Sequence, residues 1–142
     1  YTFNMKSHIS VITLGVADLK KSTDFYENLG FPVERSQDIT FIKVSKNMRM
    51  ALYGLDDMVK ESGVSTNTGD FSGITLAHNV ISKEQVDSVI EEARLKDVEI
   101  IDEPQERHWG GYSGYFKDID GYLWEVAYNP FSPEIAVDED EL

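Results

Sequence analysis

The feature that most constrains this chain is a repeated order of predicted elements, in which a strand, a helix and three strands occur twice. The first helix is predicted to begin after Asp18 and the second after Ser82, 64 residues later. Ser, Thr, Asp and Asn favour helix N-caps because their side chains accept hydrogen bonds from free backbone amides. A repeat at this spacing indicates two copies of one βαβββ unit.

The first copy begins with residues 8–16, an aliphatic and β-branched run typical of a buried strand. Gly30 can end the following helix because glycine adopts positive φ at little steric cost. Three short strands are predicted at 32–36, 39–45 and 48–54, and one helical turn at 56–61. Residues 63–70 are the most loop-like segment of the chain.

The second copy repeats this pattern from residues 73–80, which form another aliphatic strand. Ser82 and Gln85 make a capping box, and the helix that follows has one apolar face, formed by Val86, Val89, Ile90 and Ala93. Strands are predicted at 98–102, 112–117 and 122–128, with a turn at 118–121. We therefore expect a single α+β domain over 8–130, with module one at 8–61 and module two at 72–130.

The acidic balance of the chain excludes several function classes. There are 13 Lys and Arg against 26 Asp and Glu, a formal net charge of −13. Such a chain repels nucleic acids and anionic membranes. Part of the charge lies in residues 131–142, which we expect to form a solvated acidic tail. No apolar run approaches the length of a membrane span, so we expect a cytoplasmic protein.

Cysteine is absent. The chain therefore has no disulfide framework, no thiol nucleophile and no thiolate metal site.

Two motifs resemble one superfamily. ITLGVADLKKS at 12–22, followed by Phe25-Tyr26 and Leu29-Gly30-Phe31, resembles the opening of vicinal oxygen chelate proteins, and GYFKDIDGYLWE at 114–125 resembles their closing hairpin. The superfamily includes glyoxalase I, bleomycin-resistance proteins and extradiol dioxygenases. The resemblance implies that the two modules form a curved mixed sheet around a cavity that takes a small organic molecule. Because the superfamily includes lyases, isomerases, dioxygenases and binding proteins, it indicates the fold more specifically than the function.

In metal-dependent members the resemblance implies four ligands, usually two His and two Glu or Gln. They lie near the start of each module's first strand and on each module's last strand. In this chain the corresponding positions are near Val11, Ala51 and Gly73, and at Glu125. Because one ligand of four does not hold a catalytic metal, we expect no cofactor. His8 at a strand start, His78 inside a strand and His108 in a loop do not restore the set.

The segment at 109–116, WGGYSGYF, is the most distinctive of the chain. Its aromatic residues can form a pocket wall for an aromatic or apolar ligand, or can pack into the core or a dimer interface, and strand alternation suggests that some do each. We predict ligand contacts from His108, Trp109, Tyr112 and Tyr115. His108 can equally be a residue at the pocket rim without a role.

Glu125 lies between apolar neighbours on the last strand, at the position that the resemblance implies faces the cavity. It is the candidate catalytic residue, as a general base or as a metal ligand. Alternatively it is a structural carboxylate, and Arg49 is a conceivable partner for it and a candidate ligand contact.

Three functional hypotheses follow. The leading one is a metal-free homodimer that binds a small aromatic or cationic molecule. The alternative is a divalent-metal lyase, isomerase or dioxygenase, similar to lactoylglutathione lyase. The third is metal-free catalysis with Glu125 as base and a tyrosine hydroxyl as acid.

Overall fold

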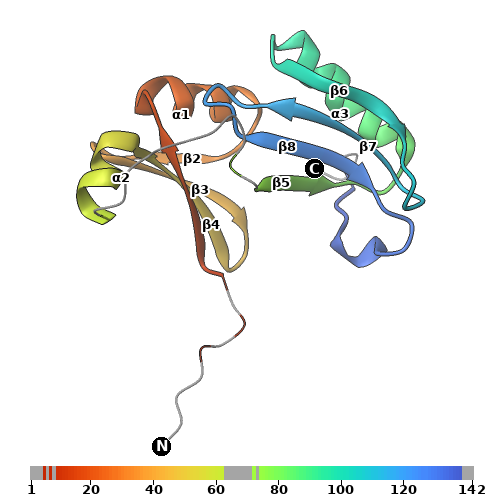
Figure 1. Cartoon of the computed structure of the whole chain (residues 1–142), viewed down its shortest axis with the longest axis horizontal. Helices are drawn as coiled ribbons and strands as arrows, with labels where there is room; N and C mark the ends of the chain where they lie inside the picture. Colours follow the sequence, from red (N-terminus) through yellow and green to blue (C-terminus); the bar gives the residue numbers. More distant parts are fainter. Residues whose placement is uncertain (1–4, 6, 8, 63–71, 73, 139–142) are drawn as a thin grey trace, which may run out of the picture. The chain divides into compact units, whose positions relative to one another are not determined.

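The computed structural model describes residues 5, 7, 9–62, 72 and 74–138, and it confirms the repeated βαβββ order (Figure 1). The chain separates into two compact units, residues 1–66 and 67–142. Their boundary falls within the segment 63–70 that was predicted as a loop, which lies outside the described residues. The enclosed cavity and the single domain over 8–130 stay predictions.

The first unit has one mixed sheet in the order β1-β4-β3-β2. The β1 strand is parallel to β4, and the other neighbours are antiparallel. The Asp18 side chain accepts a hydrogen bond from the Lys21 amide at 3.0 Å, and Gly30 has a φ of +105°, so both predicted ends of the helix are confirmed. The elements are β1 (Val11–Val16), α1 (Leu19–Asn28), β2 (Val33–Arg35), β3 (Ile39–Ser45), β4 (Met48–Gly54) and α2 (Leu55–Ser62).

One face of this sheet packs against α1. Thr23 of α1 and Thr40 of β3 share a buried hydrogen bond of 2.7 Å between their hydroxyls, which joins the helix to the sheet. The buried apolar side chains of this layer are Leu14, Val16, Tyr26, Ile42, Met50 and Leu52. Because side chains alternate along a strand, the residues between them lie on the opposite face of the sheet.

The second unit has the same strand order, β5-β8-β7-β6, with β5 parallel to β8. The Ser82 hydroxyl caps α3 by accepting from the Gln85 amide at 3.1 Å. The predicted apolar face of α3 is confirmed, since Val86, Ile90 and Ala93 are buried. No helix in the described ranges is long and apolar enough to cross a membrane. The elements are β5 (Thr75–Asn79), α3 (Lys83–Leu95), β6 (Glu99–Glu106), β7 (Tyr112–Lys117), β8 (Leu123–Tyr128) and η1 (Pro133–Ile135).

Strand β6 extends four residues beyond the predicted end at residue 102. It contains Pro104, which signals a break because proline cannot donate a backbone hydrogen bond. The β6–β7 register shifts between Ile100 and Asp102 and again between Asp102 and Gln105. An irregular edge strand accommodates proline, so the strand continues past it.

The C-terminal segment differs from the expected solvated tail. Val137 forms a parallel bridge with Val80, and its amide donates to the carbonyl of Asn79 at 3.0 Å. The side-chain amide of Gln85 donates to Asp138 at 2.7 Å. Strand β5 is an edge strand whose outer backbone groups need partners, and this segment supplies one. Residues 139–142 lie outside the described residues.

Candidate functional site

The face of the second sheet away from α3 carries the candidate site. The aromatic segment is divided between the two faces, as strand alternation predicts. On the α3 side, the Tyr112 hydroxyl donates to Asp87 of α3 at 2.7 Å, and Phe116 stacks on Trp124 with ring centroids 6.0 Å apart. Tyr115 belongs to the opposite face. The aromatic residues of the segment are therefore shared between the two faces, and the ligand contact of Tyr112 stays a prediction.

Tyr115 and Glu125 are cross-strand partners in β7 and β8. The Tyr115 hydroxyl donates a hydrogen bond to Oε2 of Glu125 at 3.0 Å, and both residues are half-buried. Burial, followed by the negative charge of Glu125 and this hydrogen bond, raises the pKa of Tyr115 above its ordinary value of 10.0. The phenol is therefore a protonated hydrogen-bond donor at neutral pH.

Arg107 connects this pair to β6. Its guanidinium lies over the Tyr115 ring, 5.5 Å from the centroid. It also donates to Asp102 at 2.8 Å and to the Ser113 hydroxyl at 2.8 Å. A continuous polar network therefore runs from Asp102 through Arg107 and Tyr115 to Glu125. Arg107, Asp102 and Ser113 were absent from our predicted site, because the irregular β6 register that brings them together has no clear sequence signal.

Within the second unit, the described residues give Glu125 no basic partner, and the Tyr115 hydroxyl supplies its hydrogen bond. Its carboxylate can thus accept a further hydrogen bond or face a cation. The partner suggested from the sequence, Arg49, belongs to the first unit, where its Nη1 donates to the carbonyls of Ser45 and Met48 at 3.1 Å each. Pairing of Arg49 with Glu125 stays a prediction.

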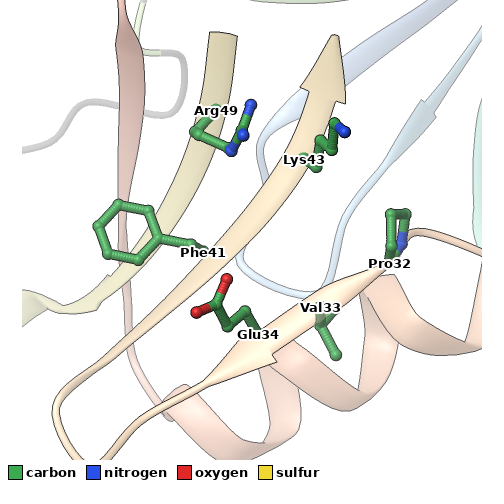
Figure 2. Close-up of a pocket in the computed structure, with 6 residues that line it drawn as sticks. All are labelled: Pro32, Val33, Glu34, Phe41, Lys43 and Arg49. Carbon is green, nitrogen blue, oxygen red and sulfur yellow. The ribbon is translucent and has the colours of Figure 1, made fainter. Parts of the chain in front are cut away.

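Arg49 lines a groove of about 350 Å³ in the first unit (Figure 2). Lys43 and Arg49 are register partners in β3 and β4, on the sheet face away from α1. Strand alternation was the signal in the sequence that could have joined Phe41 and Lys43 to Arg49. The groove is lined by Pro32, Val33, Glu34, Phe41, Lys43 and Arg49.

His108 and Trp109 lie in the tight turn between β6 and β7, which is closed by a 2.8 Å hydrogen bond from the Arg107 amide to the Gly111 carbonyl. His108 is exposed, and Trp109 is 37% exposed. A Cβ on Gly111 would lie 1.8 Å from the Trp109 ring, so glycine is required for the ring to fold back over the turn. Ligand contacts from His108 and Trp109 stay predictions.

The strand registers relate the positions that the resemblance implies for metal ligands. Ala51 pairs with Thr13 in β1, and Glu125 pairs with Ala77 in β5. Thr13 and Ala77 are 64 residues apart, the spacing of the two helix starts, so Ala51 occupies the position of Glu125 in the first unit.

The same spacing relates Val11 to Thr75. Thr75 is therefore the register counterpart of Val11 among the described residues, and the ligand position predicted near Gly73 stays a prediction. Gly73 itself lies outside the described residues.

This donor set does not fit the metal centre that the resemblance implies. Val11, Ala51 and Gly73 have no side-chain donor atom, so Glu125 is the single carboxylate of the set. His78 pairs with Val126 and lies on the face opposite Glu125, His108 lies in the turn, and His8 is outside the described residues. Within the described ranges, no three His, Cys, Asp or Glu side chains gather in a way that could hold a metal ion.

Comparison with known proteins gives a consistent family match. The profile of the glyoxalase/bleomycin resistance protein/dioxygenase superfamily matches residues 8–126. The fosfomycin resistance protein FosX of Listeria monocytogenes is 35% identical over 125 residues, which cover 86% of this chain and 90% of FosX.

Solved structures agree with this match. A glyoxalase-related enzyme from Fulvimarina pelagi aligns with a TM-score of 0.77 and 29% identity, covering 88% of this chain and 90% of that chain. A FosX variant from Listeria monocytogenes, in complex with Mn(II) and 1S,2S-dihydroxypropylphosphonic acid, aligns with a TM-score of 0.67 and 25% identity. That alignment covers 91% of this chain and 95% of the FosX chain.

Proposed function

Because the chain belongs to the glyoxalase/bleomycin resistance protein/dioxygenase superfamily, we propose that it binds a small organic molecule at Tyr115 and Glu125. The observation that carries this proposal is the hydrogen-bonded Tyr115–Glu125 pair on the sheet face away from α3. A half-buried carboxylate held by a phenol, with an oxygen left to accept, suits recognition of a small polar group.

The proposed ligand is cationic or carries a strong hydrogen-bond donor. Glu125 supplies the negative charge, and no described basic residue of the second unit forms an ion pair with it. The net charge of −13 also raises the local concentration of cations around the protein. Tyr115 holds Glu125 by one oxygen and so limits the directions in which the ligand can approach.

We propose that this binding needs no metal. Support comes from the donor set, since Val11, Ala51 and Gly73 stand at three of the positions that the resemblance implies for ligands. Removal of divalent metals by a chelator should therefore leave ligand affinity unchanged.

The alternative function is a metal-dependent enzyme, a lyase, isomerase or dioxygenase similar to lactoylglutathione lyase, or one that acts on a phosphonate as the FosX likeness suggests. The 35% identity to FosX favours the phosphonate version. Two measurements distinguish the metal-dependent enzyme from the metal-free binding protein. They are elemental analysis of protein purified without chelators and an assay of fosfomycin turnover with and without Mn(II). Stoichiometric metal that is lost in Glu125→Ala would overturn the metal-free proposal.

The Tyr115–Glu125 hydrogen bond also favours a metal-free acid–base reaction as a second candidate. Glu125 would accept a proton from a bound substrate while the Tyr115 hydroxyl donates one to a developing oxyanion. Both groups are neighbours in the structure, 3.0 Å apart, which supports their acting on one substrate. Turnover that survives chelation and is lost in Glu125→Gln would establish this reaction.

A titration with matched variants tests the binding proposal. Phenyltrimethylammonium and related aromatic cations are titrated by calorimetry into the wild-type protein, Glu125→Gln and Glu134→Gln. Glu134 is exposed in η1, so its variant makes the same change of charge away from the site. We expect Glu125→Gln to weaken binding about tenfold or more and Glu134→Gln to have little effect. Equal affinities in all three proteins would overturn the proposal.

We further propose a homodimer and a cytoplasmic location, which family membership supports. Sedimentation velocity on the full chain tests the first and fractionation of the native host tests the second. A monomer at protein concentrations well above the dissociation constant of the ligand would contradict the proposed dimer.

A further inference from the structure

The groove of the first unit is lined by two positively charged side chains, whereas the site in the second unit carries the negative charge of Glu125. Lys43 of β3 and Arg49 of β4 both line it, with Phe41 and Pro32 as apolar neighbours (Figure 2). Within the described residues of the first unit, neither cation has a carboxylate partner. Two adjacent cations without an ion-pair partner in their own unit are unusual in a chain that has twice as many acidic as basic residues.

The positions of these two cations work against sheet stability. Lys43 and Arg49 are directly opposite each other in the antiparallel β3–β4 register. Like charges at directly opposite positions destabilise a strand pair. An oxyanion between them removes this repulsion, so its binding would be coupled to relief of an unfavourable interaction.

Arg49 is already oriented. Its Nη1 donates to the carbonyls of Ser45 and Met48, which fixes one side of the guanidinium. Its Nη2 and Nε have no hydrogen-bond partner in the described part of the chain. A planar guanidinium with donors left over is suited to a carboxylate or phosphonate, because two parallel N–H groups match two oxygens.

We propose that this groove is an oxyanion site that takes the carboxylate or phosphonate of a small aromatic acid. Arg49 holds the oxyanion, Lys43 adds a second positive charge, and Phe41, 38% exposed, contacts the ring of the ligand. Glu34 lines the same groove and disfavours ligands of higher negative charge. The site lies wholly in the first unit and does not depend on the function proposed for Glu125.

Nuclear magnetic resonance titration of the labelled full chain tests the proposal. Benzoate and phenylphosphonate are the probes, inorganic phosphate tests the oxyanion without a ring, and phenyltrimethylammonium is the cation of similar shape. We expect both aromatic anions to shift the amide signals of Phe41, Lys43 and Arg49, phosphate to bind more weakly, and the cation to leave these signals in place. Unmoved signals at all three residues with both aromatic anions would overturn the proposal.

Variants give the second readout. Arg49→Gln should weaken the affinity for the aromatic anions about tenfold or more, whereas Lys46→Gln in the neighbouring exposed turn should change it less than about twofold. Glu34→Gln should strengthen binding because it removes a negative charge from the groove. Equal anion affinity in Arg49→Gln and Lys46→Gln would overturn the proposal. The signal shifts of the wild-type protein provide a test that does not depend on whether a variant folds.

Discussion

The Tyr115 hydroxyl reaches Oε2 of Glu125 across the β7–β8 pair at 3.0 Å, and the two residues are also partners in the strand register. The phenol and the carboxylate therefore lie next to each other on the sheet face away from α3. The Arg107 guanidinium lies over the Tyr115 ring and donates hydrogen bonds to Asp102 and Ser113. The arrangement leaves Glu125 as an acceptor whose orientation is set by its neighbour.

Tyr115→Phe removes the hydroxyl and keeps the ring beneath Arg107. We expect the free energy of unfolding to fall by about 0.5–1.5 kcal/mol, the net contribution of a typical hydrogen bond, as measured by urea denaturation. Tyr53→Phe in the first unit is the control, because the Tyr53 hydroxyl makes no hydrogen bond within the described residues. Equal stability of the two variants would show that the Tyr115–Glu125 bond does not stabilise the fold.

Alkaline pH should also report on this pair. The raised pKa of Tyr115 means that the folded protein favours the neutral phenol. The resulting stabilisation is present below pH 10.0, the ordinary value, and is lost as pH rises through the folded pKa. Ultraviolet titration of the wild type minus Tyr115→Phe isolates this group. In Glu125→Gln the pKa of Tyr115 should fall and yet stay above its ordinary value, since burial is the larger cause.

Tyr112 gives a separate test on the α3 side of the sheet. Its hydrogen bond to Asp87, with burial as the next cause, raises the pKa of Tyr112 to about 12. Asp87→Asn removes the carboxylate charge and should lower the pKa of Tyr112, again measured by ultraviolet titration. Asp56→Asn, on the first unit, should leave it unchanged. An unchanged pKa of Tyr112 in Asp87→Asn would show that the hydrogen bond to Asp87 does not raise it.

Two glycines at positive φ differ in their surroundings. Gly121 has a φ of +89° and open space where a Cβ would lie, whereas Gly110 has a φ of +97° and a Cβ there would lie 2.8 Å from the Phe131 ring. Gly121→Ala should cost about 1–2 kcal/mol of unfolding free energy from the backbone alone. Gly110→Ala should cost more, measured by thermal or urea unfolding, because Phe131 must also move.

Phe131→Ala supplies the control for that comparison. Combined with Gly110→Ala it removes the ring, so the extra cost of Gly110→Ala over Gly121→Ala should disappear. If the extra cost persists in the double variant, the Phe131 ring is not its source.

Lys43→Gln should not destabilise the protein in the absence of ligand. It removes a like charge directly opposite Arg49 and should stabilise the sheet by about 0.2–1 kcal/mol at low salt. The gain should shrink with added salt, because exposed charges are screened. Lys46→Gln, made in parallel, should change the free energy of unfolding less. A clear loss of stability in Lys43→Gln would contradict the repulsion between Lys43 and Arg49.

Several elements could be predicted because local chemistry determines them. Asp18 and Ser82 cap their helices as expected, and in the 118–121 turn the Asp118 side chain accepts from two backbone amides, at 2.8 Å and 2.9 Å. The predicted end of β6 was wrong, because the irregular β6–β7 register tolerates Pro104 and depends on contacts with β7. The docking of Val137 was missed because it depends on a free edge at β5, which neighbouring residues do not reveal.

By itself, the amino-acid sequence determined the duplicated βαβββ order, the two faces of each strand and the position of Glu125 on the last one. These follow from periodicity and capping, which act within a few residues. Only the tertiary structure decided that Tyr115 and Arg107 accompany Glu125 and that Lys43 lies beside Arg49. Such contacts join residues from different strands, and their register results from the packing of a whole sheet rather than from any short segment.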